Sequence, residues 1–206
     1  MQCVYCHSSH AMKVNRFIVC LLVLGTMGRG FAQDIATQAN AFLNSLSPEL
    51  KARTLFELDS KERFNFNFVP VARQGPTFHD FNEKQKTLAI ELLRASLGKD
   101  GYQKATAIIE LENVLIVLEN RGKDDHYRDP LNYHFCIFGT PSSTKPWGWR
   151  FEGHHVAFNF VSSDSKIVSS TPSFLGSNPG TVLSGPDKGK QVLKIETDLG
   201  FQLVNS

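Results

Sequence analysis

The first third of the chain contains two kinds of spacing between apolar residues. From Asp34 to Leu46 they recur every three to four positions, which predicts an amphipathic helix. A second helix is predicted to begin at Ser47-Pro48-Glu49, because serine can cap a helix and proline suits its first position, and to run to about Phe56. The strict alternation Phe64-Asn65-Phe66-Asn67-Phe68 predicts a half-buried strand.

Two longer helices are predicted in the middle of the chain. Helical spacing of leucine, isoleucine and alanine covers 82–97 and 102–119, and Gly98-Lys99-Asp100-Gly101 separates the two segments. The charged segment 121–130 that follows is predicted to be an exposed loop. The charged residues expected to face solvent in this region are Glu110, Glu112, Glu119, Arg128 and Asp129.

After Pro130 the spacing changes to a period of two, which is typical of strands. Strands are predicted at 133–138, 149–161 and 166–170, and the turn at 162–165 joins the last two as a hairpin.

The last part of the chain has a different composition. Segment 171–185 is rich in serine, glycine and proline and is predicted to be a loop, and a final helix is predicted to begin at Gly185-Pro186-Asp187. The order of elements predicts an α+β fold in which N-terminal helices pack on an antiparallel sheet, with a C-terminal helix.

The composition and the N-terminal segment indicate where the folded domain begins. The chain has 206 residues, of which 41% are hydrophobic and 20% are charged, as expected for a soluble globular domain. From Met12 a basic start, the apolar run 17–24 and small residues before Gln33 follow the order of a secretory signal peptide. We therefore expect an upstream extension and signal peptide at 1–32, and a single mature domain at 33–206.

The predicted signal peptide also predicts the location of the protein. Its apolar run is shorter than the roughly 20 residues that a membrane-spanning helix needs. The mature protein is therefore expected to be secreted, periplasmic or in the cell envelope. Contact with the membrane is expected only through the signal peptide before cleavage.

The expected leader also carries most of the basic excess and most of the cysteines. It contains three basic and no acidic residues, so its removal changes the formal net charge from +2 to −1, and the charge does not favour a nucleic-acid partner. Cys3-Val4-Tyr5-Cys6-His7 fits a haem-attachment pattern, but it precedes the signal peptide, so haem is not expected. Cys136 remains alone, without a cysteine to form an internal disulfide, and is expected to be a buried filler.

Candidate chemistry concentrates between residues 146 and 160. This stretch contains both tryptophans, Glu152, and the adjacent pair His154 and His155. On one continuous strand, Glu152 and His154 would share a face with the core residues Phe158 and Phe160, and His155 would face the other way.

Four motifs resemble an uncharacterised family, the domain-of-unknown-function 3500 family, and the likeness covers essentially the whole mature chain. The resemblance implies an exported protein but no activity. Family members usually continue further, with another histidine-containing segment, so the resemblance implies that the domain at 33–206 is incomplete at its C-terminal end. The matching motifs are Glu62-Arg63-Phe64-Asn65, Gly101-Tyr102-Gln103-Lys104-Ala105, Pro146-Trp147-Gly148-Trp149-Arg150-Phe151-Glu152-Gly153-His154-His155 and Ser170-Thr171-Pro172-Ser173-Phe174-Leu175-Gly176-Ser177-Asn178-Pro179.

The leading functional hypothesis is a metal-dependent hydrolase-like site. Glu152, His154 and His155 are the candidate catalytic residues, and the two histidines are the candidate ligands of zinc or iron. No established metal-binding spacing is present, so further ligands would have to come from elsewhere, for example His79, His126 or His134. A purely structural histidine beside aromatic side chains, with Glu152 paired to Arg150, explains the same residues and is the commoner case.

The alternative hypothesis is a non-catalytic protein that binds a small molecule or a component of the cell envelope. Aromatic side chains often line ligand sites, and polar neighbours then fix the orientation of the ligand. The candidate ligand-binding residues are Trp147, Trp149, Arg150 and Asn159.

Overall fold

The computed structural model describes residues 34–122 and 125–206, which belong to one compact unit of the chain, Phe31–Ser206. The predicted signal peptide and the Cys3-to-His7 pattern lie outside the described residues. Within the described ranges, no helix is long and apolar enough to cross a membrane.

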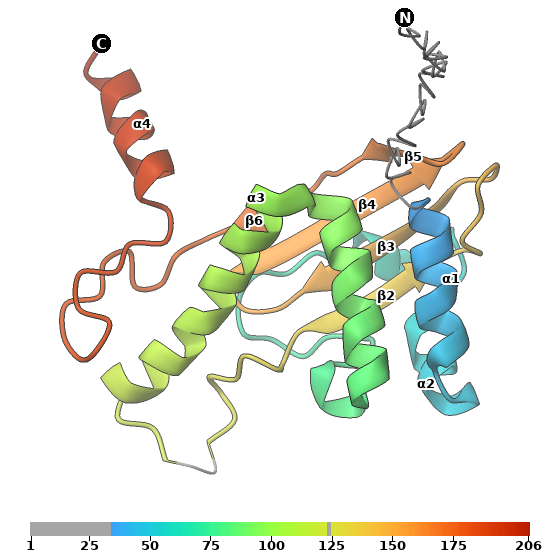
Figure 1. Cartoon of the computed structure of the whole chain (residues 1–206), viewed down its shortest axis with the longest axis horizontal. Coiled ribbons are helices and arrows are strands. Elements are labelled where there is room, and N and C mark those ends of the chain that lie inside the picture. The colour runs from blue at the N-terminus through green and yellow to red at the C-terminus, as the bar shows by residue number, and fades with distance from the viewer. Residues whose placement is uncertain (1–33, 123–124) are drawn as a thin grey trace, which may run out of the picture. The chain divides into compact units, whose positions relative to one another are not determined.

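Helices and one sheet make up the described chain, which confirms the α+β class (Figure 1). The sheet is six-stranded with the order β1-β2-β3-β4-β5, and β6 pairs with β4. The pair β1–β2 is parallel and the others are antiparallel. The elements are α1 (Ile35–Ser45), α2 (Pro48–Thr54), β1 (Leu55–Phe56), η1 (Lys61–Phe64), η2 (Phe78–Asp80), α3 (Glu83–Leu118), β2 (His134–Phe138), β3 (Trp147–Glu152), β4 (Val156–Ser163), β5 (Lys166–Ser169), β6 (Ser173–Leu175) and α4 (Lys194–Val204).

Local capping explains where the first helices begin. Asp34 accepts a hydrogen bond from the backbone of α1, and Ser47 accepts one from Leu50 at the start of α2. Asn82 and Gln85 form a reciprocal capping box at the start of α3. These caps satisfy backbone N–H groups that have no partner within the helix. The predicted starts of all three helices are therefore confirmed.

Gly98 interrupts α3 where the sequence predicts a break between two helices. Its φ of 66° and ψ of −177° are non-helical and lie in a region that glycine enters without steric cost. The predicted pair of helices is thus confirmed as the two halves of α3, 83–97 and 99–118, which meet at an angle over the sheet (Figure 1). We call them the N-terminal and C-terminal halves of α3.

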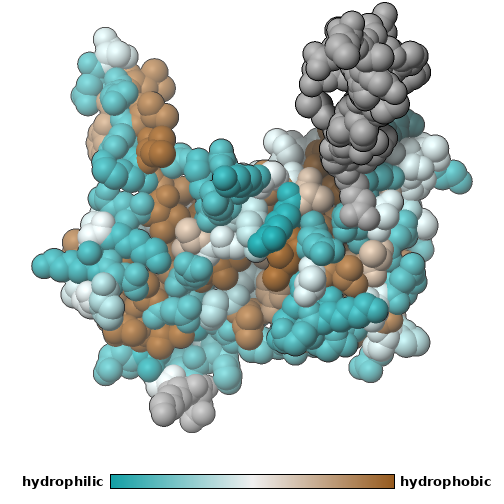
Figure 2. Space-filling model, in the orientation of Figure 1, coloured by the Kyte–Doolittle hydropathy of each residue, from teal (hydrophilic) through white to brown (hydrophobic). Residues whose placement is uncertain are grey.

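An aromatic core fills the space between these helices and one face of the sheet. Phe135 of β2 lies at its centre and contacts the rings of Phe42, Phe78, Phe81 and Phe151 at centroid distances of 4.9–5.6 Å. The helices α1 and α3 pack against each other above this face. The hydrophilic side chains of the helices form much of the outer surface in Figure 2.

The predicted strand 149–161 is wrong, because it is a hairpin. Strands β3 and β4 are antiparallel, with Phe151 opposite Phe158 and Glu152 opposite Ala157, and residues 153–155 form the turn. Residues directly opposite each other share a face of the sheet, so Glu152 shares one face with Ala157 and Phe151 shares the other with Phe158. Glu152 therefore lies on the face opposite Phe158, and the predicted shared face of Glu152 and His154 does not exist.

The predicted strand at 64–68 is also wrong. Residues 61–64 form the short helix η1 and an irregular segment follows. Its carbonyl groups bond to buried side chains, since Arg150 Nη1 donates to the carbonyls of Glu62 (2.6 Å) and Asn65 (2.5 Å). Those carbonyls therefore have no need of a neighbouring strand.

Two differences concern the C-terminal part. The predicted loop 171–185 contains the short strand β6, which pairs with β4. The last helix begins at Lys194 and not near Gly185, because Gly185 and Gly189 adopt positive φ angles of 80° and 92° in a looped segment closed by a Val182 N–H to Lys190 carbonyl bond.

Substitution Gly153→Ala tests the turn that separates β3 from β4. A Cβ atom at Gly153 would lie 2.3 Å from Cδ1 of the buried Tyr133 ring. We expect the free energy of unfolding, measured with urea, to fall by about 1–3 kcal/mol. Gly180→Ala is the matched control, because nothing lies within 4 Å of the position that its added Cβ atom would take. Equal stability of the two variants would contradict this account of the turn.

Candidate functional site

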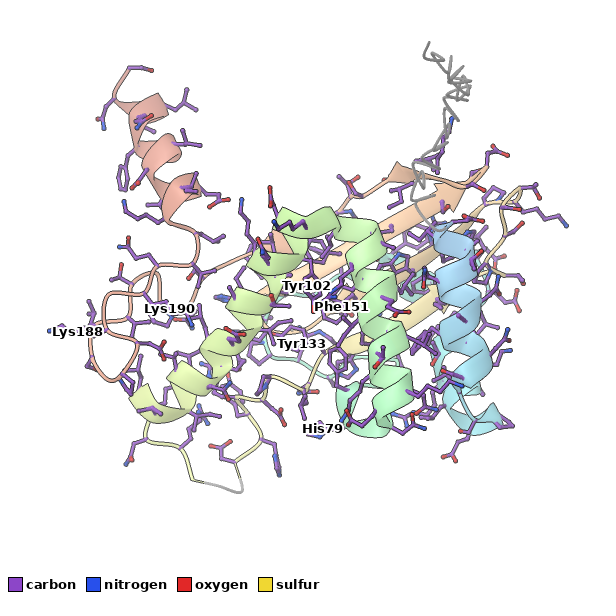
Figure 3. The ribbon with its side chains drawn as sticks, viewed as in Figure 1. His79, Tyr102, Tyr133, Phe151, Lys188 and Lys190 are labelled. Carbon is purple, nitrogen blue, oxygen red and sulfur yellow. The ribbon has the colours of Figure 1, made fainter. Side chains whose placement is uncertain are left out.

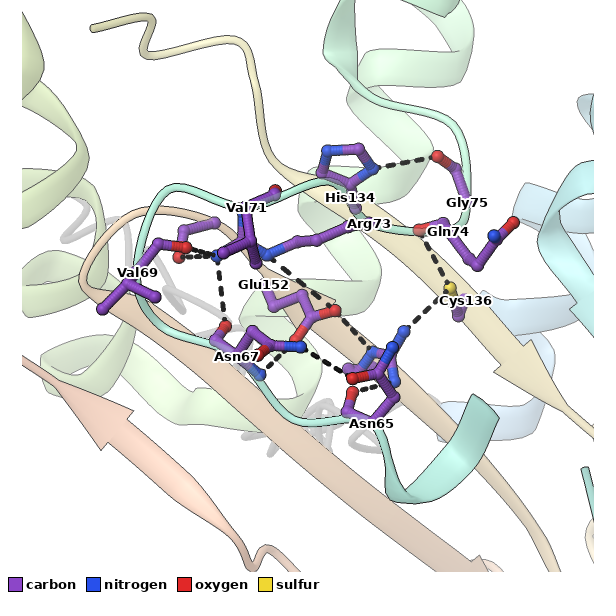
Figure 4. A network of polar contacts seen from close by, with 12 residues as sticks. Asn65, Asn67, Val69, Val71, Arg73, Gln74, Gly75, His134, Cys136 and Glu152 are labelled. Atoms are coloured by element: carbon purple, nitrogen blue, oxygen red, sulfur yellow. Dashed lines mark hydrogen bonds and ion pairs between the residues drawn. The ribbon is translucent and has the colours of Figure 1, made fainter. Parts of the chain in front are cut away.

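A buried ion network fixes the segment that borders the candidate site (Figure 4). Nε of Arg150 lies 3.0 Å from Oε1 of Glu152, and the other end of the guanidinium pairs with Glu62 at 2.5 Å. Oε2 of Glu152 accepts a hydrogen bond from the backbone of Asn67. The side chains of Arg150 and Glu152 are 0% and 1% exposed, and burial raises the pKa of the Glu152 carboxyl.

Arg73 joins this network to the turn between β3 and β4. Its Nη2 donates to the carbonyls of Val69 (2.5 Å) and Gly153 (3.1 Å), and its Nε lies 3.9 Å from Oε1 of Glu152. Burial lowers the pKa of the Arg73 guanidinium, whereas the nearby charge of Glu152 opposes this effect. The network thereby holds residues 69–73 beside the histidine pair.

Three hydrogen bonds fix the backbone of the turn itself. The hydroxyl of Tyr133 donates to the carbonyl of His154 (2.7 Å), and the N–H of His155 donates to the carbonyl of Phe68 (2.8 Å). The N–H of Gly176 donates to the carbonyl of His155, which has a positive φ of 60°. Burial raises the pKa of Tyr133, so its hydroxyl stays protonated and remains a donor.

Glu112 and His154 form the central pair of the candidate site. Oε1 of Glu112, on the C-terminal half of α3, forms a short hydrogen bond with Nδ1 of His154. The two side chains are 3% and 11% exposed. An ionised carboxylate only accepts hydrogen bonds, so Nδ1 carries the proton and Nε2 is the nitrogen left to exchange one.

Arg128 places a positive charge against the same imidazole. Its Nη1 lies 3.2 Å from each ring nitrogen of His154. Because Nη1 is equally far from both nitrogens, it does not lie along the lone pair of Nε2. The lone pair of Nε2 therefore remains available for another hydrogen bond. His154 is thus held between a carboxylate and a guanidinium.

Glu119 in turn fixes Arg128. Its carboxylate accepts from Nε and Nη2 of Arg128, the latter at 2.7 Å, and also from Nε of Arg121 at 2.5 Å. Both guanidinium groups lie over the ring of Tyr127, at 4.3 and 4.7 Å from its centroid. The hydrogen bonds from Arg128, and then those from Arg121, lower the pKa of Glu119 to about 2.

A polar pocket of about 280 Å³ opens beside the Glu112–His154 pair. The segment held by Arg73 forms one wall, and the loop between α3 and β2 forms another. The lining residues are Pro70, Val71, Ala72, Arg73, Glu112, His126, Tyr127, Asp129, Asn132 and His154. The imidazole of His154 therefore borders an accessible space.

The structure separates the three predicted catalytic residues. His154 lines the pocket, whereas the ring of His155 packs against that of His154, with centroids 4.2 Å apart. Burial and the neighbouring His154 and Arg128 lower the pKa of His155, which favours its neutral form. Glu152 pairs with Arg150, as the structural interpretation of the sequence predicts, and not with His154, whose carboxylate partner is Glu112.

The predicted ligand-binding residues lie mainly in the interior. Trp147 and Trp149 are 0% and 1% exposed, and Trp149 stacks on Phe160. Arg150 is fully buried in the ion network. Asn159, which is 9% exposed, borders a separate small pocket of about 150 Å³.

The histidines considered as further metal ligands lie in two places. His126 lines the polar pocket, and both His126 and His79 are near Oδ2 of Asp129, at 3.9 and 2.7 Å. His134 instead bonds to the carbonyl of Gly75. Among the residues that the structure describes, no group of three or more His, Cys, Asp or Glu is arranged to hold a metal ion.

Sequence reasoning missed Glu112 and Arg128, which were expected to face solvent but are buried, whereas Glu119 is exposed as predicted. Glu112 is 3% exposed overall and Arg128 is 9% exposed. The available signal was the position of Glu112, four residues after Ile108 and three before Leu115, both of which are buried. A carboxylate on the apolar stripe of a helix needs a buried partner, and that partner lies in a distant segment.

Comparison with known proteins gives one match. A family model described as "Protein of unknown function (DUF3500)" matches residues 29–206. No curated protein and no solved structure matches the chain significantly.

Substitution Glu119→Gln tests the charge network through its pH dependence. The pKa of Glu119 falls from 4.5 to about 2 on folding, so its stabilising effect is present above about pH 4.5 and is lost as the pH falls towards 2. Allowing for solvent screening, we expect the variant to be less stable by about 1 kcal/mol at pH 7 and the difference to vanish near pH 2. Urea unfolding at several pH values measures this difference.

Glu83→Gln is the control, since the Glu83 side chain is 90% exposed. A Glu119→Gln effect that is the same at pH 7 and pH 2.5 would show that the carboxylate charge is not its cause.

Proposed function

The chain belongs to the DUF3500 family, as its motifs predict, and since the function of this family is unknown we propose one: an exported hydrolase-like enzyme in which His154 and Glu112 act as an acid–base pair. The observation that carries the proposal is the buried Glu112–His154 hydrogen bond at the edge of a polar pocket. Histidine exchanges protons near neutral pH, and a carboxylate on its other nitrogen fixes the tautomer and stabilises the charged ring.

The pocket lining favours water as the nucleophile. None of the described residues that line it is a serine, threonine or cysteine. In the proposed reaction, Nε2 of His154 takes a proton from water while the oxygen attacks an electrophilic centre of the bound substrate. The leaving group then departs with the proton returned by His154, so the enzyme ends in its starting state.

A metal-dependent form of this proposal keeps zinc or iron as a cofactor. His154 and Glu112 would supply two ligands, and a catalytic zinc usually has three from the protein. His126, whose exposed ring lines the same pocket, is the candidate for a third. Stoichiometric zinc or iron in purified protein, lost on His154→Ala, would support this form over the metal-free one.

The alternative proposal, ligand binding through the tryptophans, has less support. Neither indole has an exposed face, so a ligand could not stack on them without rearrangement of the core. Binding of a small molecule at the polar pocket, in contrast, is part of the enzyme proposal.

Activity measurements test the acid–base pair. We expect hydrolysis of at least one compound in a panel of 4-nitrophenyl acetate, phosphate and glycosides, with kcat/KM reduced about 10²–10⁴-fold in His154→Asn and in Glu112→Gln. The double variant is expected to be no slower than His154→Asn, because the two residues act as a unit.

His134→Asn is the matched control, since His134 is a half-buried histidine outside the pocket. Urea unfolding of each variant separates loss of catalysis from loss of structure. Equal rates for wild type and His154→Asn on every compound of the panel would contradict the proposal.

Export is the second part of the proposal. The family match begins at residue 29, so the basic start and apolar run of the proposed signal peptide precede the matched region. We expect the protein expressed in a Gram-negative host to reach the periplasm with Gln33 as its first residue, as measured by mass spectrometry. Replacing both Leu21 and Leu22 with aspartate should block cleavage. Recovery of cytoplasmic protein that still begins at Met1 or Met12 would contradict export.

A further inference from the structure

An apolar crevice lies between the two halves of α3. Its volume is about 260 Å³, and its floor includes the buried residues Leu93 and Phe151. The lining residues are Phe78, Lys86, Ile90, Leu93, Tyr102, Thr106, Ile109, Glu110, Pro130, Leu131 and Phe151. Figure 3 shows Tyr102 and Phe151 in the opening between the two helix halves, and Figure 2 shows apolar surface in this region.

The kink at Gly98 explains why the crevice is open. The non-helical φ and ψ of Gly98 change the direction of the chain, so the two halves of α3 diverge and leave space between them. Ile90 and Leu93 line the crevice from one half, and Tyr102 and Ile109 line it from the other. The crevice therefore lies directly over the buried core residues Leu93 and Phe151.

Two polar groups at the rim, the amine of Lys86 and the hydroxyl of Thr106, already have partners. Lys86 pairs with Glu83 at 2.9 Å, and the hydroxyl of Thr106 donates to the carbonyl of Tyr102 at 3.0 Å. Because most of the lining is apolar, a ligand here would gain affinity mainly from burial of its apolar surface.

The volume of the crevice limits what can occupy it. A cavity of about 150 Å³ in an apolar protein core holds benzene. A crevice of about 260 Å³ therefore suits one aromatic ring or a medium-length alkyl chain. A helix, about 10 Å across with its side chains, is too wide for it.

The crevice adjoins the polar pocket of the candidate site. Pro130 and Leu131 line the crevice, and the residues on either side of them, Asp129 and Asn132, line the polar pocket. Tyr133 also links the two, because its ring stacks on that of Phe151 at 5.5 Å and its hydroxyl bonds to the carbonyl of His154 (Figure 3).

From this arrangement we propose that the crevice binds the apolar arm, an alkyl chain or single aromatic ring, of the same small molecule whose polar part occupies the pocket beside His154. The natural ligand is then an amphiphile. The placement of its polar part rests on the proposed function, whereas binding of the apolar arm does not.

Methyl NMR tests the crevice directly. Hexanoate and decanoate, with acetate as the polar control, are added to protein with labelled isoleucine methyl groups. We expect the signals of Ile90 and Ile109 to shift, and those of Ile167 on β5 and Ile195 on α4 to stay in place. Affinity should rise up to about fourfold for each added methylene until the crevice is full.

Two variants sharpen this experiment. Leu131→Asp places a charge at the rim, where Leu131 is 39% exposed, and should weaken decanoate binding at least tenfold. Val168→Asp, at a residue 60% exposed on β5, is the matched control and should bind as the wild type does. His154→Asn should also bind decanoate, because His154 does not line the crevice.

The outcomes separate this inference from the proposed function. Shifts confined to Ile195, or no shift of Ile90 and Ile109, would overturn the crevice as a binding site even if the enzyme is active. If 4-nitrophenyl esters are hydrolysed, kcat/KM for the hexanoate over the acetate should exceed one, and Leu131→Asp should lower this ratio. Hydrolysis without any chain-length preference would overturn the link between the crevice and the pocket.

Discussion

The buried ion pair between Arg150 and Glu152 is the interaction on which the site depends. Both side chains are almost fully removed from solvent, and removal of one partner from such a pair typically costs about 3–5 kcal/mol because the other charge is left uncompensated. The protein limits the desolvation cost by adding Glu62, Arg73 and the backbone of Asn67 as further partners. These partners belong to the segment 61–76, so the network ties that irregular segment to the sheet.

The position of His154 follows from this tie. Residues 70–73 form a wall of the polar pocket, and Arg73 bonds both to the carbonyl of Val69, just before this wall, and to the carbonyl of Gly153. The turn between β3 and β4 is therefore fixed from one side by Arg73 and from the other by Tyr133. With its backbone held in this way, His154 meets Glu112 from the distant helix α3 in one geometry. Such preorganisation is what an acid–base pair requires.

The sequence could predict those features that depend on neighbouring residues. The starts of α1, α2 and α3 follow from caps within a few positions, and the class of fold follows from the change of apolar period after Pro130. The β3–β4 hairpin was not predictable in the same way, because Gly153-His154-His155 lacks the Asn-Gly or Asp-Gly pair that marks a tight hairpin turn. The pairing of His154 with Glu112, 42 residues earlier, required the tertiary structure.

The two carboxylates around His154 show why proximity in sequence was misleading. Glu152 is two residues away, but the turn at Gly153 sends the chain into the next strand and leaves Glu152 on the face occupied by Arg150. Glu112 lies on an apolar stripe, where an unpaired carboxylate would be costly, and the imidazole of His154 provides the hydrogen bond that it needs. The same burial that makes Glu112 depend on His154 strengthens its electrostatic effect on the ring. The Glu112–His154 hydrogen bond therefore both satisfies the buried carboxylate of the helix and forms the acid–base pair of the proposed reaction.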